Sequence, residues 1–248
     1  MSVLVVGSIA LDTVETPFGV AEAVLGGSAV YFSLAASYFS PVSLVSVVGN
    51  DFPDKYTQLL RDRSVGLEGL EVMDGKTFRW NGQYGGAMNE AQTREGQLNV
   101  FDSFLPTVPD PCRVSRFLFL ANPAPSTQLH VRNQLPDADF VLADTMNLWI
   151  ETEKKALLEL LKTLDGLVLN DDEARQLTGC HNLLRAGRWI LERGPDYCFI
   201  KKAEHGAMFL GPNGIFVLPG FPTDEVRDPT GAGDSFAGGL VGYASTGD

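Results

Sequence analysis

The chain has 248 residues, of which 44% are hydrophobic and 20% charged, a composition typical of a globular protein with an ample core. Its formal net charge of −12 argues against a nucleic-acid partner, since binding to a phosphate backbone depends on clustered Lys and Arg. No apolar run approaches membrane-spanning length, so we expect no membrane partner. No signal-peptide pattern opens the chain, and the three scattered cysteines do not suggest a disulfide framework. We therefore expect a cytoplasmic protein.

Short apolar or β-rich segments alternate with helical patterns along the chain. The expected strands are Val3–Val6, Val42–Val48, Phe117–Leu120, Phe140–Ala143, Gly166–Asn170 and Tyr197–Lys201. The expected helices are Ser28–Phe39, Asp54–Arg63, Ser126–Gln134, Glu151–Leu164 and Leu183–Glu192. This alternation predicts an α/β fold in which helices cover both faces of a mostly parallel sheet. We expect one domain over residues 1–248.

Two regions, at about 12–25 and 77–101, interrupt the alternation. They are rich in Gly, Asn, Gln, Thr and aromatic residues, and Thr77–Trp80 and Gln97–Phe101 are predicted as strands of a small second sheet. Long insertions in an α/β core are usually functional lids or disordered loops, and the aromatic residues argue against disorder. The two regions therefore predict a small β-sheet lid.

The most informative segment is the glycine-rich stretch Asp228–Gly239. At its centre Gly231, Ala232 and Gly233 expose successive backbone N–H groups at the start of a helix, where unpaired amides and the helix dipole favour an anion. Asp234 follows directly, and a bound phosphate gains nothing from an adjacent acid. We therefore predict that Asp234 takes a proton from an alcohol while the amides hold a phosphoryl group. From this segment alone, a structural glycine turn with a capping Asp is an equal alternative.

Two motifs near the N-terminus also suggest a ligand. Gly26 and Gly27 open an apolar helix, and paired glycines allow a ligand to approach the backbone closely, although a flexible loop end followed by a Ser cap is the better explanation of these residues taken alone. Asp12 follows the first strand, and ligands of open α/β sheets bind at strand ends. A lone Asp in a turn is otherwise structural.

Charged residues follow two later strands. Asn170 to Glu173 form an acidic helix start, which the helix dipole alone would favour but which also suits Mg²⁺ held through a carboxylate and substrate phosphates. Lys201 and Lys202 end a predicted strand, where they either contact phosphate or are simply exposed. We favour Lys201 for a nucleotide contact.

Together these motifs resemble the ribokinase-like, or PfkB, family of carbohydrate and nucleoside kinases, from Val3 to Tyr243. The resemblance implies transfer of the γ-phosphoryl group of ATP to a hydroxyl of a sugar or nucleoside, with Mg²⁺ and also K⁺ as cations. It implies that Asp234 is the catalytic base and that the amides of Gly231, Ala232 and Gly233 form the anion hole. It does not choose the sugar or nucleoside, and it suggests a homodimer formed through the lid sheet.

The resemblance also assigns the remaining candidate residues. Those expected to bind the substrate are Asp12, Gly26, Gly27, Tyr31, Arg79 and Asn147. Those expected to bind ATP are Asn170, Lys201, Gly206, Thr230, Gly231 and Gly233, with Glu173 organising Mg²⁺ through water and Asp228 beside a monovalent cation. The chain departs from the family pattern at Tyr31, where ribokinases commonly carry Asn, and at Ala203, which replaces the first glycine of the turn that ends at Gly206.

Other classes fit less well. A dinucleotide-binding oxidoreductase needs Gly-x-Gly-x-x-Gly after an early strand, and a P-loop NTPase needs Gly-x4-Gly-Lys-Ser/Thr; the sequence contains neither. A non-catalytic sugar- or nucleoside-binding protein is the alternative that stays open. The chain ends 14 residues after Asp234, whereas the resemblance implies further helices beside the adenine pocket.

Overall fold

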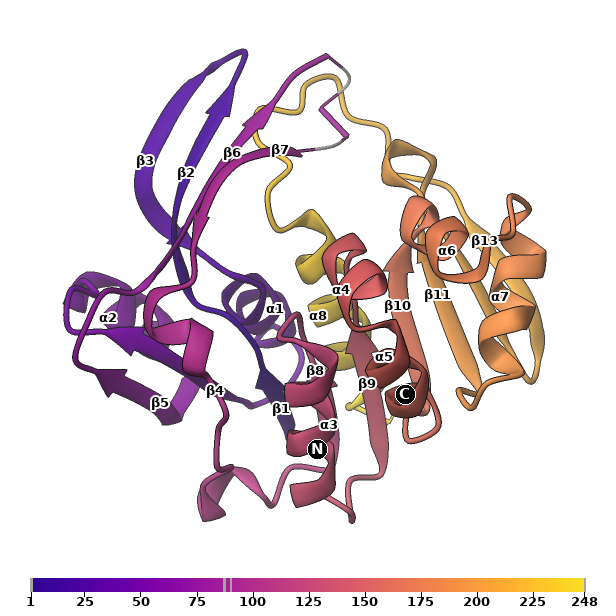
Figure 1. Cartoon of the computed structure of the whole chain (residues 1–248), viewed down its shortest axis with the longest axis horizontal. Helices are drawn as coiled ribbons and strands as arrows, with labels where there is room; N and C mark the ends of the chain where they lie inside the picture. Colours follow the sequence, from indigo (N-terminus) through magenta and orange to yellow (C-terminus); the bar gives the residue numbers. More distant parts are fainter. Residues whose placement is uncertain (1, 87, 90, 248) are drawn as a thin grey trace. The chain divides into compact units, whose positions relative to one another are not determined.

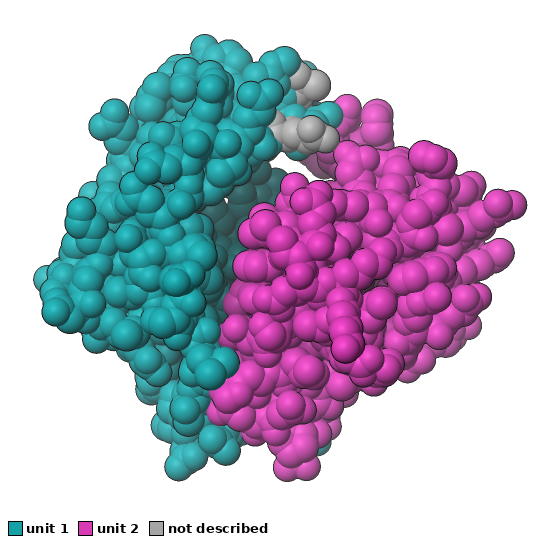
Figure 2. All heavy atoms as spheres, in the orientation of Figure 1, with its two compact units in different colours: residues 1–117, 223–248 teal, residues 118–222 magenta. Residues whose placement is uncertain are grey.

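The computed structural model describes residues 2–86, 88–89 and 91–247. Residues 87 and 90, within the insertion predicted at 77–101, lie outside the described part. The chain divides into two compact units, coloured separately in Figure 2. Unit 1 is discontinuous and comprises residues 1–117 and 223–248, whereas unit 2 is the continuous segment 118–222.

Unit 1 contains parallel strands covered by helices (Figure 1). The strands are β1 (Val3–Val6), β4 (Val42–Gly49) and β5 (Val65–Met73), with β4 paired to both of the others. The helices are α1 (Ser28–Ala36), α2 (Asp54–Asp62) and α8 (Ala232–Ala244), and a 3₁₀ turn spans Asp110–Cys112. Helix α1 contacts β1 and β4, α8 packs on α1, and α2 contacts β5. Residues of β1 are fully buried, as expected for a parallel strand covered on both faces.

A small second sheet also belongs to unit 1. It consists of β2 (Ala10–Thr16), β3 (Gly19–Gly26), β6 (Phe78–Tyr84) and β7 (Ala91–Gln97), in the order β3-β2-β6-β7. In Figure 1 these strands extend together as long ribbons. The sheet has its own hydrophobic cluster of Val14, Tyr84 and Met88, against which Trp80 and Ala91 pack.

The prediction of a strand at Gln97–Phe101 is wrong, because β7 ends at Gln97 and a 3₁₀ turn spans Asn99–Ser103. Asn99 has a φ of 52°, outside the extended region, and its side-chain amide donates to the Thr77 carbonyl at 3.0 Å. The Phe101 ring then stacks on the Phe104 ring, with centroids 5.0 Å apart. Tertiary contacts of Asn99 and Phe101 therefore override a strand-like pattern.

Unit 2 has one sheet with helices packed on it. Its strands, in spatial order, are β8 (Phe117–Leu120), β9 (Phe140–Asp144), β10 (Gly166–Asn170), β11 (Tyr197–Lys201), β12 (Ala207–Gly211) and β13 (Gly214–Leu218). Strands β9, β10 and β11 are parallel, and β12 and β13 continue antiparallel. The helices are α3 (Pro125–Gln134), α4 (Asn147–Thr152), α5 (Lys154–Leu161), α6 (Asp171–Thr178) and α7 (Leu183–Leu191), and a 3₁₀ turn spans Ala203–His205.

The predicted fold class is confirmed: a mostly parallel sheet flanked by helices, with a small second sheet. One predicted helix, Glu151–Leu164, is divided into α4 and α5 at Glu153. The Glu153 carboxylate accepts a hydrogen bond from the Ser126 N–H at 3.1 Å, which ties this break to the start of α3. Among the described residues, no helix is both long enough and apolar enough to cross a membrane.

Candidate active site

Asp12, on β2, is a buried acid with an unsatisfied oxygen. Its side chain is 4% exposed, and among the described residues Oδ1 has no hydrogen-bond partner. Burial, followed by the nearby carboxylates of Asp228 and Asp234, raises its pKa to about 7, against the opposing effect of the Gly27 amide. The structure therefore brings Asp12 and Asp234 into one electrostatic environment, and an unpaired buried oxygen is costly unless a ligand satisfies it.

Gly26 and Gly27 allow the backbone to pass close to Asp12 and Ser8. A Cβ atom on Gly26 would overlap the Asp12 carboxylate, and one on Gly27, whose φ is 99°, would lie 2.5 Å from the Ser8 carbonyl oxygen. Ser8 and Ser28 exchange backbone-to-side-chain hydrogen bonds at 3.1 and 3.3 Å, which fixes the start of α1 at the end of β1. Only glycines fit here, so the paired glycines are required by close packing.

The predicted anion hole lies at the N-terminus of α8. Gly231 is the N-cap residue with a φ of 74°, a left-handed conformation that favours glycine. The Ala232 N–H donates to the Pro229 carbonyl at 3.1 Å, so this amide is engaged within the turn. Among the described residues, the N–H groups of Gly231 and Gly233 meet no acceptor. Two of the three predicted amides are thus available to an anion, and Asp234 lies in the same first helical turn.

Two tyrosines surround this turn. The Tyr31 ring, on α1, lies against Gly231, since a Cβ atom there would overlap the ring. The Tyr84 hydroxyl, at the end of β6, accepts a hydrogen bond from the Thr230 hydroxyl at 3.4 Å. Burial raises the pKa of both phenols, and the carboxylates of Asp12, Asp228 and Asp234 raise each further. Both hydroxyls therefore stay protonated at neutral pH and can donate to a ligand.

Arg79, predicted to bind the substrate, is engaged with Asp51. Its guanidinium donates to Asp51 Oδ2 at 2.8 Å, while Asp51 Oδ1 accepts from the N–H and the hydroxyl of Thr77, each at 2.7 Å. Burial acts to raise the pKa of Asp51, but these hydrogen bonds hold it below its ordinary value on balance. The cluster ties the loop after β4 to the start of β6, at the base of the small sheet.

In unit 2, Asn170 and Glu173 form a capping box at the start of α6. The Asn170 side chain accepts from the Glu173 N–H at 2.8 Å, and the Glu173 carboxylate accepts from the Asn170 N–H at 2.6 Å. Asp171 and Asp172 both pair with Arg175, as expected of surface charges at a helix start. The motif therefore has a complete structural explanation, in addition to the role predicted toward Mg²⁺.

Lys201 lies beside Asn170, since the two residues are register partners at the carboxyl ends of β11 and β10. Its ammonium group pairs with the buried carboxylate of Asp144 at 2.9 Å. Gly206, with a φ of 86°, lies where a Cβ atom would overlap the Leu218 carbonyl oxygen. Asn147, the first residue of α4, is exposed. Unit 2 thus gathers Asn170, Lys201 and Asp144 at one end of its parallel strands, where α/β folds bind ligands.

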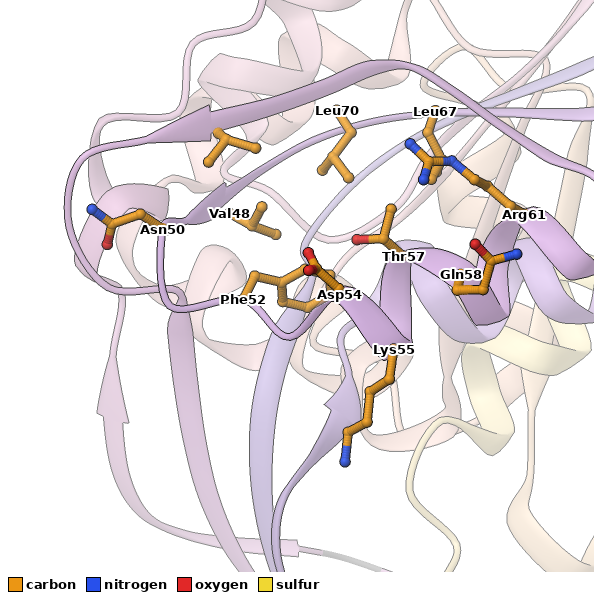
Figure 3. Close-up of a pocket in the computed structure, with 12 residues that line it drawn as sticks. Val48, Asn50, Phe52, Asp54, Lys55, Thr57, Gln58, Arg61, Leu67 and Leu70 are labelled. Carbon is orange, nitrogen blue, oxygen red and sulfur yellow. The ribbon is translucent and has the colours of Figure 1, made fainter.

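A separate cavity of about 600 Å³ lies between α2 and the strands β4 and β5 (Figure 3). Val48, Leu67 and Leu70 line it from the strands, and Thr57 and Arg61 line it from α2. None of the residues predicted to bind substrate, nucleotide or metal lines it. It is therefore distinct from the site around Asp12.

Comparisons with known proteins agree with this architecture. A cytidine kinase from Thermococcus kodakarensis is 26% identical over 253 residues, spanning 98% of this chain and 89% of the relative. The solved nucleoside kinase of Burkholderia thailandensis in complex with inosine matches with a TM-score of 0.81 at 18% identity, covering 99% of this chain and 84% of its own. An E. coli protein solved with ATP and Mg²⁺ matches with a TM-score of 0.81 at 20% identity, covering 100% and 87%.

The fold is ribokinase-like, and the protein is a phosphotransferase with an alcohol group as acceptor. The profile described as pfkB family carbohydrate kinase matches residues 12–247, and the chain belongs to that family.

Three residues of these clusters were not predicted from the sequence. Tyr84, Asp51 and Asp144 contact candidate residues that lie 146, 28 and 57 positions away in the chain. No local motif marks such contacts. Only Asp144 could have been found from the sequence, because an acid at the carboxyl end of a predicted parallel strand is a candidate for a ligand site.

Proposed function

We propose that this chain is an ATP-dependent kinase that transfers the γ-phosphoryl group to a hydroxyl of a nucleoside, with a simple sugar as the alternative acceptor. One observation carries the proposal: the unpartnered Oδ1 of buried Asp12 shares an electrostatic environment with Asp234, beside the unpaired amides of Gly231 and Gly233. Phosphoryl transfer asks a protein mainly for positioning and charge stabilisation. An acid that holds a hydroxyl, a second acid that takes its proton and an anion hole supply these functions.

In this mechanism, Asp12 accepts a hydrogen bond from an acceptor hydroxyl, and Gly26 and Gly27 leave room for the ligand. Asp234 accepts the proton of the reacting hydroxyl as general base. The amides of Gly231 and Gly233 stabilise the charge on the transferring phosphoryl group. The Ala232 amide contributes less than was predicted from the sequence, because Pro229 already occupies it.

On the nucleotide side, we propose that Asn170, Lys201, Gly206 and Thr230 bind ATP, with Glu173 holding Mg²⁺ through water. Among the described residues, no cluster of three or more His, Cys, Asp or Glu side chains could hold a metal directly. The oxygen donors of Glu173 and Asn170 instead suit a hydrated Mg²⁺ bound mainly by substrate phosphates, whose charge the cation would neutralise. Lys201 is positioned by Asp144, which keeps its ammonium group at the strand end.

A nucleoside is favoured over a simple sugar for two reasons. The cytidine kinase relative spans 98% of this chain. In addition, Tyr31 stands where ribokinases commonly carry Asn, and its partly exposed phenol shares the site with Asp12. Aromatic rings suit stacking on a planar base better than contact with a small sugar.

The test is ADP release with Mg²⁺ and ATP across cytidine, inosine, adenosine, ribose and fructose, with Asp234→Asn as the background control. We expect kcat/KM for at least one nucleoside to exceed that for each sugar by about tenfold or more. Preference for a sugar would overturn the choice of acceptor. Calorimetric binding of a nucleoside without turnover would instead support the non-catalytic alternative.

Replacing K⁺ by Na⁺ tests the cation proposed at Asp228, and sedimentation tests the predicted homodimer.

A further inference from the structure

The anion loop, residues 228–231, has few tethers to the rest of unit 1. Its internal turns are local: the Thr230 N–H donates to Asp228 Oδ1 at 2.9 Å, and the Ala232 N–H donates to Pro229. Asp228 itself is exposed. Among the described residues, the N–H groups of Ala232 and Ser235 tie this loop to α8, which directly follows it, and the hydrogen bond from Thr230 to Tyr84 is the one that ties it to an element distant in the chain. The other anchor is the ring of Tyr31, which lies against Gly231.

The position of the Tyr84 hydroxyl is determined by the small sheet. Tyr84 is the last residue of β6, pairs with Ala91 of β7, and is 9% exposed. Its ring packs with Val14 and Met88 in the hydrophobic cluster of that sheet. Any shift of the sheet therefore moves the Tyr84 hydroxyl, and the hydrogen bond transmits this shift to Thr230.

We propose that Tyr84 is a positioning residue: through Thr230, its hydroxyl couples the small sheet to the anion loop, so that the Gly231 and Gly233 amides are fixed when the sheet is in place over the acceptor. This inference rests on the proposed kinase function. Anion holes act by preorganisation, so a loop that samples other positions stabilises the transferring group less. Because of this coupling, phosphoryl transfer depends on an acceptor that orders the sheet. Hydrolysis of ATP by water in the absence of an acceptor is thereby reduced.

The kinetic test uses two variants that each remove one hydroxyl, Tyr84→Phe and Thr230→Val. We expect each to lower kcat by about 3- to 10-fold, the effect of one lost hydrogen bond, with the KM for the acceptor changed less than about twofold. The double variant should be no worse than the worse single variant, and Thr230→Ser, which keeps the hydroxyl, should lose less than Thr230→Val. If the fold loss of kcat in the double variant equals the product of the two single losses, the two hydroxyls act independently and the proposed coupling is overturned. The KM for ATP is measured separately, because Thr230 is also proposed to contact the nucleotide.

Tyr56→Phe is the matched control. The Tyr56 hydroxyl, on α2, donates to the Ala23 carbonyl of β3 at 3.1 Å, so this variant also removes a tyrosine hydroxyl bound to the small sheet. It does not touch the anion loop, and we expect wild-type kinetics. A loss equal to that of Tyr84→Phe would show a general effect on the sheet and would overturn the specific coupling.

A second readout does not need turnover. In the ligand-free protein, Tyr84→Phe and Thr230→Val should raise amide hydrogen exchange over residues 230–233 several-fold, whereas Tyr56→Phe should leave it unchanged. Unchanged exchange in Tyr84→Phe would overturn the inference even if the protein is active. If the wild type phosphorylates no acceptor, the proposed function fails, and the exchange data alone decide whether the coupling exists.

Discussion

The ring of Tyr31 lies directly against the backbone of Gly231, so that α1 and the N-terminus of α8 meet in van der Waals contact at the anion loop. Gly231 has a φ of 74°, and a Cβ atom there would overlap the Tyr31 ring. Tyr31 therefore packs against the N-terminus of α8, where we propose the anion hole.

Gly231→Ala should combine backbone strain with this overlap. We expect a loss of about 2–5 kcal/mol in the free energy of unfolding, with a marked fall in kcat. Gly179→Ala is the matched control, because Gly179 has a φ of 71° and a methyl group added there would meet no atom within 4 Å. It should cost only the strain, about 1–2 kcal/mol. Equal losses in the two variants, measured by denaturant unfolding, would argue against the contact with Tyr31.

Asp234→Asn removes the proposed base while keeping its size. Loss of a positioned general base lowers kcat by about 10²- to 10⁴-fold, and the KM for the acceptor should change little. Asp224→Asn, which changes an exposed acid outside the proposed site, should retain most turnover. Steady-state ADP release checks both variants, and turnover above about a tenth of wild type in Asp234→Asn is incompatible with its role as base.

Burial of Asp12 predicts a pH-dependent stability. Its pKa in the folded protein is about 7, above the ordinary value of 3.8, so the folded state favours the protonated acid. The stability that this provides is fully present below about pH 4 and is lost as pH rises through 7. Asp12→Asn should therefore stabilise the ligand-free protein more at pH 8 than at pH 4, by at most roughly 4 kcal/mol.

The same variant should weaken acceptor binding, because an amide is a poorer acceptor of the hydroxyl proton than a carboxylate. Urea unfolding at pH 4 and pH 8 measures the first effect, and calorimetry measures the second. A stability difference that does not vary with pH would contradict the raised pKa of Asp12.

The two roles of the acidic segment at α6 can be separated. Asn170→Ala breaks the capping box and should cost about 1–2 kcal/mol of stability. Glu173→Gln preserves an oxygen for the Asn170 N–H, so the melting temperature should stay close to wild type while the Mg²⁺ concentration for half-maximal rate rises several-fold. Asp172→Asn, which affects only an exposed pair with Arg175, is the control. An unchanged Mg²⁺ requirement in Glu173→Gln would leave Glu173 with capping alone.

Two adjacent glycines of α8 should respond in opposite ways to alanine. A Cβ atom on Gly238 would overlap the Phe32 carbonyl oxygen and lie 2.9 Å from the Ala35 Cβ, whereas one on Gly239 meets no atom within 4 Å. Gly238→Ala should destabilise by about 1–3 kcal/mol through overpacking. Gly239→Ala should stabilise by up to about 1 kcal/mol, because alanine is the better helix former. Thermal unfolding of both variants checks this; destabilisation by Gly239→Ala would contradict the packing.

Sequence reasoning worked best where the structure is determined locally. Strands β1, β8, β10 and β11 have the predicted bounds because they are continuous apolar segments, and the helix starts at Gly27, Asn170 and Gly231 are marked by residues within one turn. Strand β5 was missed because its glycines and glutamates hide the pattern of an edge strand. The hairpin β12–β13 was missed although Asn213-Gly214 is a recognised turn signal.

The candidate site likewise contains residues that a local sequence pattern marks and residues that only the tertiary fold brings together. Gly26, Gly27 and Gly231 could be predicted because close backbone approach selects glycine at each position. The engagement of Arg79 by Asp51, of Lys201 by Asp144 and of Thr230 by Tyr84 could not, because each depends on residues brought together only by the tertiary fold.

The packing of α8 on α1 has a consequence for biosynthesis. Ser40 and Ser245 share a hydrogen bond across 205 positions of the chain, and Gly242 lies against Ala36. While the ribosome makes residues 37–231, α1 therefore lacks the helix that covers it, whereas unit 2 is already continuous. Closing so long a loop is entropically costly and slow. The surroundings of the glycine pair that begins α1 are thus complete only after the residues of α8 have been synthesised.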